Sequence, residues 1–210
     1  MAMNGVLWMT EHSGKMKGIN SIGTSCANNP HCMKRRENGD SICSHCYAAT
    51  YMKMRKALKQ HLEENAEILK TRLLQGREIP VTNAQVMRFE SFGDLYNTTH
   101  LWNYVLICKE NPHTNFALWT KNTWILDELF NKLGVEKPEN LSIVVSSPLV
   151  NKQMELDREN FWFVDHVFTV YDKKYIEEND VSINCGSRNC LGCQICYHKN
   201  TEFYVREKLK

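Results

Sequence analysis

Eight of the nine cysteines gather in two groups at opposite ends of this 210-residue chain, and their spacing predicts metal chemistry. The N-terminal cysteine group has the spacing C-x5-C-x10-C-x2-C, and the C-terminal cysteine group has the spacing C-x4-C-x2-C-x2-C. Thiolates at this density bind soft metals, chiefly zinc or iron–sulfur clusters. The predicted ligands are Cys26, Cys32, Cys43 and Cys46 in the first group, and Cys185, Cys190, Cys193 and Cys196 in the second.

The spacing of the C-terminal group favours an iron–sulfur cluster. Cys190, Cys193 and Cys196 follow a ferredoxin-like C-x2-C-x2-C pattern, and Cys185 supplies a fourth ligand for a 4Fe-4S cubane. Zinc ribbons usually combine two C-x2-C pairs about 15–20 residues apart, which neither group does. We therefore expect an iron–sulfur cluster, with zinc as the alternative. The spacing allows two separate four-ligand sites or one site shared by both ends of the chain.

The composition is that of a folded globular protein, with 42% hydrophobic and 24% charged residues. The length predicts a single α/β domain over residues 1–210. No apolar run approaches the length of a membrane span, and residues 1–17 lack the apolar core of a signal peptide. We therefore expect an intracellular protein, in which cysteines bind metal rather than form disulfides. The net charge of +2 neither requires nor excludes nucleic acid.

Strand and helix patterns alternate along the chain, which predicts a mostly parallel sheet. Strands are expected at residues 17–23, 86–92, 115–120, 141–145, within 161–171, and at 181–184. Helices are expected at residues 47–75, from about 101 to 110, and at 122–133. A metal-binding loop at 24–46 follows the first strand, and a metal-binding segment at 185–196 follows the last. Cys46 lies at the start of the first helix, where the dipole and free N–H groups favour a thiolate.

Polar residues follow the predicted strands at their carboxyl ends, where ligands bind in parallel α/β folds. Glu90, Asp94 and Lys121 are the candidate catalytic residues on this ground. Each also has a simpler interpretation, because Asp94 can belong to a plain turn, Glu90 can face solvent from a strand, and Lys121 can be exposed. If the sheet is parallel throughout, both cysteine groups should lie on one rim close to these residues.

Four stretches resemble a phage-encoded family, the gene-product-eighty-eight-like proteins. They are residues 18–22 with the cysteines that follow, and residues 43–48, 88–94 and 118–122. The resemblance implies a phage origin and therefore a place in the host cytoplasm. The same stretches resemble radical-SAM enzymes more distantly, which implies a partial TIM barrel with a cysteine-rich loop after the first strand. The chain lacks the C-x3-C-x2-C motif that leaves one iron open for S-adenosylmethionine, so this resemblance implies the architecture more than the activity.

We expect an iron–sulfur protein with a redox or electron-transfer role, because eight cysteines can ligate every iron of a cluster. A zinc-stabilised nucleic-acid-binding protein is the alternative, since basic residues stand near Tyr47 and Tyr51 and could hold phosphates while the rings stack on bases. A protein that binds a host partner is a further alternative. The basic residues are Lys34, Arg35, Arg36, Lys53, Arg55, Lys56 and Lys59.

Overall fold

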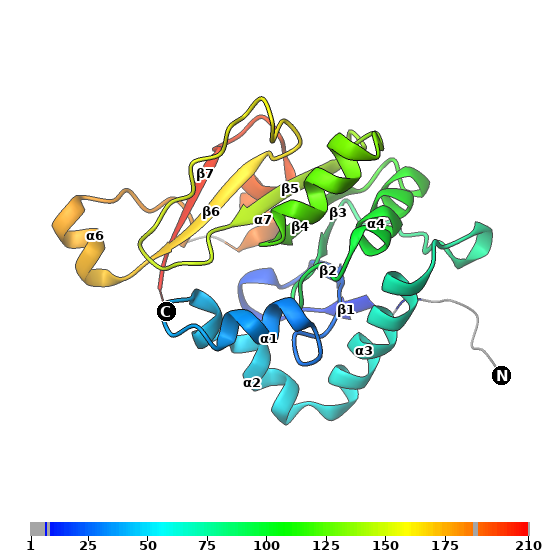
Figure 1. Cartoon of the computed structure of the whole chain (residues 1–210), viewed down its shortest axis with the longest axis horizontal. Helices are drawn as coiled ribbons and strands as arrows, with labels where there is room; N and C mark the ends of the chain where they lie inside the picture. Colours follow the sequence, from blue (N-terminus) through cyan, green and yellow to red (C-terminus); the bar gives the residue numbers. More distant parts are fainter. Residues whose placement is uncertain (1–6, 8, 187–188, 210) are drawn as a thin grey trace.

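The computed structural model describes residues 7, 9–186 and 189–209, and its centre is a seven-stranded sheet (Figure 1). The strands stand side by side in chain order; β1 is antiparallel to β2, and every other neighbouring pair is parallel. The sheet is open, with β1 and β7 at its edges. The strands are β1 (Met9–Glu11), β2 (Asn20–Ile22), β3 (Val86–Phe89), β4 (Asn115–Thr120), β5 (Leu141–Ser146), β6 (His166–Tyr171) and β7 (Tyr204–Lys208). The predicted α/β class with a mostly parallel sheet is confirmed.

Helices connect the strands and pack mainly on one face of the sheet (Figure 1). The α-helices are α1 (Pro30–Arg36), α2 (Tyr47–Met54), α3 (Lys56–Thr71), α4 (Thr98–Glu110), α5 (Thr123–Asp127), α6 (Lys173–Asn179) and α7 (Cys190–Cys193). Shorter helical turns are η1 (Gly14–Met16), η2 (Ile42–His45), η3 (Gly76–Glu78), the π-helical η4 (Glu128–Lys132) and η5 (Ile195–Tyr197). Helices α3, α4 and α5 contribute to the main core, which the central strands complete.

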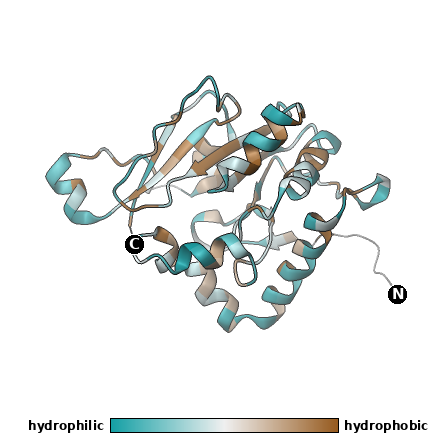
Figure 2. Cartoon of the chain, in the orientation of Figure 1, coloured by the Kyte–Doolittle hydropathy of each residue, from teal (hydrophilic) through white to brown (hydrophobic). Residues whose placement is uncertain are grey.

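The central strands are buried on both faces of the sheet. Successive side chains of a strand point to opposite faces, so each strand packs in two directions. Phe89 and Phe116 face the helices, stacked with ring centroids 4.8 Å apart. Trp119 and Phe168 face the other way and meet edge-on at 4.6 Å. Figure 2 shows the hydrophobic colour concentrated in the central strands and the hydrophilic colour on outer helices such as α6.

The C-terminal cysteine segment covers the face of the sheet opposite the helices. Tyr197 packs with Ile19 and Ala117, and Cys196 packs against the same cluster. Cys196 also packs against a second small cluster, which contains Phe168 of β6. The segment that carries the C-terminal cysteine group is therefore part of the second core of the fold.

The predicted helix at residues 47–75 is wrong as one element, because it breaks at Arg55 into α2 and α3 and ends at Thr71. Met52 of α2 and Leu62 of α3 both pack around Cys26, and Leu69 of α3 packs in the main core on the sheet. The two helices joined at Arg55 therefore share the cluster around Cys26, and α3 continues from it to the main core.

The predicted last strand at residues 181–184 is also wrong, because the last strand is β7. The Asn184 side chain takes the place of a strand backbone there: its amide donates to Tyr204 O at 2.9 Å and its oxygen accepts from Arg206 N at 2.8 Å. On the outer side of β7, Cys185 pairs with Glu207 as an isolated bridge.

Three further differences concern element boundaries. The short strand β1 was not predicted. Within the range 161–171, where a strand was predicted, β6 occupies the second half. The predicted loop at 24–46 contains α1 and η2. The predicted helix at 122–133 is present as α5 and η4, followed by Gly134 with φ +64°. Among the described helices, none has both the length and the apolar character needed to cross a bilayer.

Candidate functional site

The N-terminal cysteine group lies on short elements that follow β2. Cys26 comes after the strand and is 2% exposed. Cys32 lies in α1, where its N–H donates at 3.2 Å to the side chain of Asn29, the residue that caps this helix. Cys43 lies in η2, and Cys46 is the N-cap residue of α2. The local fold therefore places two of the four thiols at or near helix starts.

Three of these cysteines share one apolar cluster. Cys26, Cys32 and Cys46 pack with side chains of α2, α3 and Phe92. Cys43 is near enough to Cys32 for its charge to raise the pKa of that thiol, together with the larger effect of burial. The four predicted ligands of this group are thus brought together by the fold, although the chain separates them by up to ten intervening residues.

Hydrogen bonding between Cys26 and Cys46 makes the two thiols unequal. The thiol of Cys26 donates to Cys46 and lowers the pKa of Cys46 from 9.0 to about 6. Backbone N–H groups of Ala49 and Ala48 at the start of α2 and the charge of Lys121 act in the same direction. The pKa of Cys26 is raised, because its proton is held in the bond to Cys46 and because the thiol is buried. The hydrogen bond therefore favours the thiolate form of Cys46 and the thiol form of Cys26.

Glu90 fixes the beginning of the loop that carries this group. It follows β3 with a left-handed φ of +58° and is 2% exposed. Its Oε2 accepts from Thr24 Oγ1 at 2.9 Å, and its Oε1 accepts from the Tyr104 hydroxyl at 2.5 Å and lies 3.2 Å from His100 Nε2. Such strain persists only where surrounding contacts enforce it. The carboxylate therefore links the start of the loop to β3 and α4.

Asp94 fixes the other side of the same loop. Its carboxylate accepts from the Thr120 hydroxyl at 2.5 Å, from Lys121 N at 3.1 Å and from Arg35 Nη1 at 3.3 Å. Its backbone carbonyl accepts from Asn29 Nδ2 at 2.7 Å. Arg35 and Asn29 flank Cys32 in the sequence, so this network ties α1 to the carboxyl ends of β3 and β4.

The C-terminal cysteine group begins at the edge strand β7. The N–H of Cys185 donates to Arg206 O at 3.0 Å. Its Sγ accepts from Lys15 Nζ at 3.0 Å, and the same ammonium is 2.9 Å from Glu207 Oε1. Burial raises the pKa of Cys185, and the bond from Lys15 acts against that rise.

The remaining three cysteines of this group lie on two consecutive turns. Cys190 and Cys193 are the first and last residues of α7. Asn189 caps this helix, and its side chain accepts from Gly192 N at 2.7 Å. Cys196 lies in η5, and burial raises its pKa to about 12. Charges of the other cysteines of the group add to this rise.

Both cysteine groups line one cavity of about 960 Å³ on the face of the sheet opposite α3, α4 and α5. Lys121 and Ser146, at the carboxyl ends of β4 and β5, also line it. In Figure 1 the C-terminal end of the chain lies beside the segment that carries α1 and η2. The two groups thus face a common cavity, but the prediction that both lie on one rim is wrong for the C-terminal group, because Cys190 and Cys196 pack on the face of the sheet. The cysteines that line the cavity are Cys43, Cys46, Cys185, Cys190, Cys193 and Cys196.

The three candidate catalytic residues lie in different places relative to this cavity. Lys121 lines it, whereas Glu90 and Asp94 do not and are engaged in the buried networks described above. Glu90 does not face solvent, as the simpler interpretation proposed, because it lies beyond the end of β3 and turns inward.

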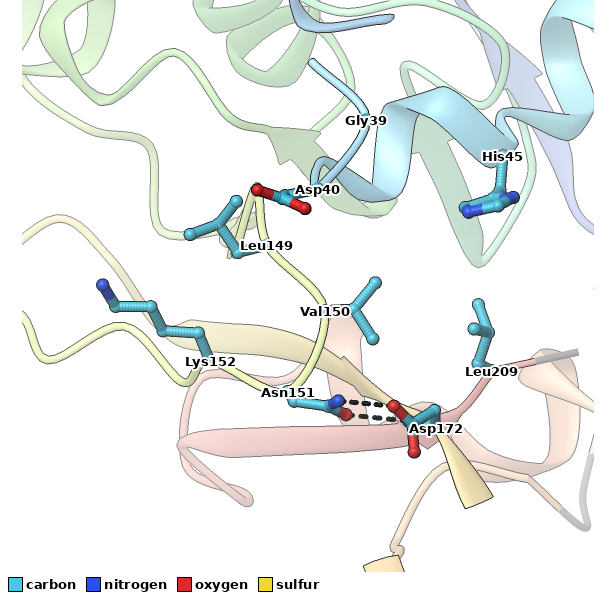
Figure 3. Close-up of a pocket in the computed structure, with 9 residues that line it drawn as sticks. All are labelled: Gly39, Asp40, His45, Leu149, Val150, Asn151, Lys152, Asp172 and Leu209. Atoms are coloured by element: carbon cyan, nitrogen blue, oxygen red, sulfur yellow. Dashed lines mark hydrogen bonds between the residues drawn. The ribbon is translucent and has the colours of Figure 1, made fainter. Parts of the chain in front are cut away.

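A smaller cavity of about 450 Å³ adjoins the main one, since His45 and Leu209 line both. Figure 3 shows Asp40 and His45 on one side of it and the loop bearing Asn151 on the other. Asn151 Nδ2 donates to Asp172 Oδ2 at 2.5 Å, and Asp172 N donates to Asn151 Oδ1 at 2.9 Å (Figure 3). These two hydrogen bonds hold the loop that carries Asn151 against the start of α6.

A model of the gene product 88 family matches residues 6–195. The chain belongs to the gene product 88 family. The match covers β1 to β6 and seven of the eight grouped cysteines, and stops one residue before Cys196. No curated protein and no solved structure matches the chain. Family membership confirms the resemblance to the gene-product-eighty-eight-like proteins and assigns no chemistry to the cysteines.

The donor set of this family member fits an iron–sulfur cluster in number and kind. Each group offers four thiols, the ligand number of a cubane. In the described part of the chain, no three His, Cys, Asp or Glu side chains converge on one point as they would around a single ion. The cysteines of a cubane bind different irons, so their sulfurs surround a body rather than a point.

Sequence patterns indicated Tyr47, Tyr51, Arg55 and Lys121, but not the other aromatic and basic side chains that complete the cavity. Arg88 of β3 lies over the Trp119 ring, with its guanidinium carbon 4.3 Å from the centroid. Phe92 stacks on His12 at 5.4 Å and approaches Tyr51 at 6.2 Å. A charged residue inside an otherwise apolar strand was the available signal, because Arg88 interrupts the run from Val86 to Phe89.

Proposed function

We propose that this gene product 88 family protein binds iron–sulfur clusters through its two cysteine groups and uses them in electron transfer or another redox reaction. The observation that carries the proposal is the shared cavity, which gathers six cysteines from opposite ends of the chain. Structural cysteines that only fill a core have no reason to gather around one cavity. Thiols that hold redox centres for a common partner have to lie around the cavity that the partner enters.

Each group is proposed to hold its own cluster. Within the N-terminal group, Cys26 is affected by Cys46 and Cys32, and Cys32 by Cys43. Within the C-terminal group, Cys196 is affected by Cys185, Cys190 and Cys193. These mutual effects stay within each group, which supports two four-cysteine sites rather than one site with ligands from both.

Cations near the thiols support an anionic cluster at each site. Lys121 favours the thiolate form of Cys46, Arg88 favours the thiolate forms of Cys190 and Cys196, and Lys15 donates to Cys185. A cluster with four thiolate ligands carries net negative charge, and potentials depend on such charges and on hydrogen bonds to sulfur. When bound, the clusters would supply one-electron chemistry, while these residues hold them and balance their charge.

The architecture is proposed to be an open, barrel-like relative of the radical-SAM arrangement. Six strands, β2 to β7, follow one another in chain order and are parallel, and the cysteine-rich loop follows β2. The absence of C-x3-C-x2-C from the sequence distinguishes the chain from radical-SAM enzymes. With four cysteines for each cluster, no iron is left open for S-adenosylmethionine, so the proposed chemistry is electron transfer. Lys121 lies on the substrate side of the cavity, and Glu90 and Asp94 act as positioning residues.

Metal analysis of protein purified without oxygen tests the proposal. We expect a brown protein with a broad absorption band near ~400 nm that bleaches on reduction, and about four irons and four sulfides for each site. A colourless protein with one or two zinc ions would overturn the iron–sulfur assignment and make the metal structural.

The basic residues that suggested nucleic-acid binding are partly used inside the protein. Arg35 bonds to Asp94 and to Lys121 O at 3.2 Å, and Arg36 donates to Cys26 O at 3.2 Å. These two side chains therefore serve the N-terminal cysteine group. Lys53 and Lys56 remain exposed at the junction of α2 and α3, without a matching surface that favours a second function.

A further inference from the structure

The side chains that line the main cavity carry an excess of positive charge. Among the described residues that line it, five are Lys or Arg and two are Glu, which leaves an excess of three positive charges. One of the five, Lys15, is paired with Glu207. The five basic residues are Lys15, Arg55, Arg88, Lys121 and Lys208.

Arg88 and Lys121 have no acidic partner among the described residues. The Arg88 guanidinium lies over Trp119 and points one nitrogen, Nη1, at Met16 Sδ at 3.3 Å. Its Nε is buried without a hydrogen-bond partner. Lys121 bonds through its backbone to Asp94 and Arg35, which leaves its ammonium available to the cavity. A buried donor without a partner costs free energy, which a bound anion would recover.

Aromatic rings form the wall near these cations. Tyr47, Tyr51 and Phe92 form a cluster with centroids 6.2–6.3 Å apart, and the Tyr47 hydroxyl donates to Ser91 O at 2.6 Å, which fixes its ring. Trp119 and Phe168 line the cavity from the sheet. Rings and a few convergent charges in a cavity of this size are typical of a small-molecule site.

We propose that this cavity binds a small organic anion with a flat apolar ring system, held by Arg88 and Lys121 and stacked against the aromatic wall. The inference rests on the proposed function and deepens it, because such a ligand would lie between the two cysteine groups and could exchange electrons with clusters bound there. The redox partner would therefore be an organic anion with a flat ring system.

Two fluorescent probes that share a ring system test the role of the negative charge. 1-Anilinonaphthalene-8-sulfonate carries a sulfonate, and N-phenyl-1-naphthylamine has the same rings without it. Both are titrated against the anaerobically purified protein, and iron is measured in the same samples. We expect the sulfonate probe to bind about tenfold more tightly, the order expected for one charge-assisted hydrogen bond.

Charge-removing variants locate the site. Arg88→Gln and Lys121→Gln should each weaken the sulfonate probe about tenfold and leave the neutral probe unchanged. Tyr51→Ala should weaken both probes, whereas the control Lys109→Gln, on the exposed side of α4, should change neither. Tyr51→Ala and Lys109→Gln should keep the iron content of the unmodified chain, and the two charge variants are compared with it at equal iron content.

The outcomes separate the two claims. Equal affinity for the two probes, or sulfonate binding unchanged in both charge variants, overturns the anion site while leaving the clusters in place. The iron-free protein could prefer the sulfonate probe and lose this preference when iron is bound. That result also overturns the anion site, because the cations then serve only the clusters. A wild-type protein that never takes up iron but prefers the sulfonate probe keeps the anion site and overturns the proposed redox function.

Discussion

The N-terminal cysteine group is anchored by a buried network, whereas the C-terminal group rests on the sheet through a few partly exposed contacts. Thr24, Asn29 and Arg35 tie the first group to Glu90 and Asp94, two nearly fully buried carboxylates. The second group has the bridge at Cys185, the Lys15 ion pair, the Asn189 cap and the packing of Cys190 and Cys196. The fold therefore holds the first group more firmly than the second.

The two groups also differ in the pKa values of their thiols. Cys46 in the first group has its pKa lowered to about 6, while Cys196 in the second has its pKa raised to about 12. With metal bound as proposed, the first group would start from a thiolate, whereas the second would have to lose protons as metal enters. Loading of the second group would therefore depend more on pH.

Removal of a single ligand from the C-terminal group should have the largest effect. Cys193→Ser should reduce the iron content by about half and lower the melting temperature, because metal binding energy in such sites is folding energy, about 10 kcal/mol in small zinc sites. Iron analysis and thermal unfolding measure both. The control Cys108→Ala removes a buried thiol outside both groups and should keep the full iron content. An unchanged iron count in Cys193→Ser removes Cys193 from the ligand set.

Thiol reactivity in protein freed of metal should follow the pKa difference. At pH 7, alkylation of Cys46 should be roughly 100-fold faster than that of Cys196, and its rate should reach half its maximum near pH 6. Mass spectrometry of iodoacetamide-treated samples between pH 5 and 9 gives both rates. Cys26→Ala removes the donor to Cys46 and should move the midpoint upward. Similar rates at the two cysteines would remove the contrast between the groups.

The same shifts give opposite dependences of stability on pH in the metal-free protein. The folded pKa of Cys46 lies below its ordinary value of 9.0, so its stabilising contribution is present above pH 9 and is lost as the pH falls through 6. The folded pKa of Cys196 lies above 9.0, so its contribution is full below pH 9 and is lost as the pH rises toward 12.

Glycine substitutions should separate the rigid site from the adaptable one. A Cβ at residue 93 would lie 2.5 Å from Thr24 O and 2.6 Å from Glu90 Oε2, so Gly93→Ala should cost about 2–3 kcal/mol of unfolding free energy. A Cβ at residue 186, beside Cys185, meets only Ile183 Cγ2 at 3.9 Å, so Gly186→Ala should cost less than about 0.5 kcal/mol. Chemical denaturation measures both costs. Equal costs would contradict the account of the buried network.

Matched cation substitutions should give the smallest effects. Arg35→Gln leaves the buried Asp94 carboxylate without its charged partner and should cost about 2 kcal/mol. Lys15→Gln removes a partly exposed pair with Glu207 and should cost less than about 1 kcal/mol. A larger cost for Lys15→Gln, measured by denaturation under the same conditions, would reverse the ranking of the two groups.

The sequence predicts the central strands well and the edge poorly, for physical reasons. Strands β4 and β5 are buried on both faces, so their apolar runs mark them nearly to the residue. Strand β7 reads Tyr-Val-Arg-Glu-Lys with only Val205 buried, because an edge strand needs little apolar surface. The break at Arg55 has no local signal, because Tyr51, Met54, Leu58 and Leu62 keep helical spacing across it.

Cysteine spacing predicts which residues form the site, while topology decides what surrounds them. The alternation of strands and helices predicted both groups on one rim, which is wrong for the C-terminal group. The inward turn of Glu90, with its left-handed φ, depends on Thr24 and Tyr104, and no spacing rule connects these residues. The position of Arg88 on Trp119 depends likewise on the order of β3 and β4 in the sheet.

Electron paramagnetic resonance of the reduced, iron-loaded protein tests the central claim most directly, because it reports both the clusters and their proximity. Two clusters facing one cavity should give a spectrum broadened or split by spin–spin interaction, and Cys193→Ser should simplify it to the signal of one isolated cluster. A spectrum of non-interacting clusters in the unmodified chain, or a protein with zinc and no cluster signal, would contradict the account.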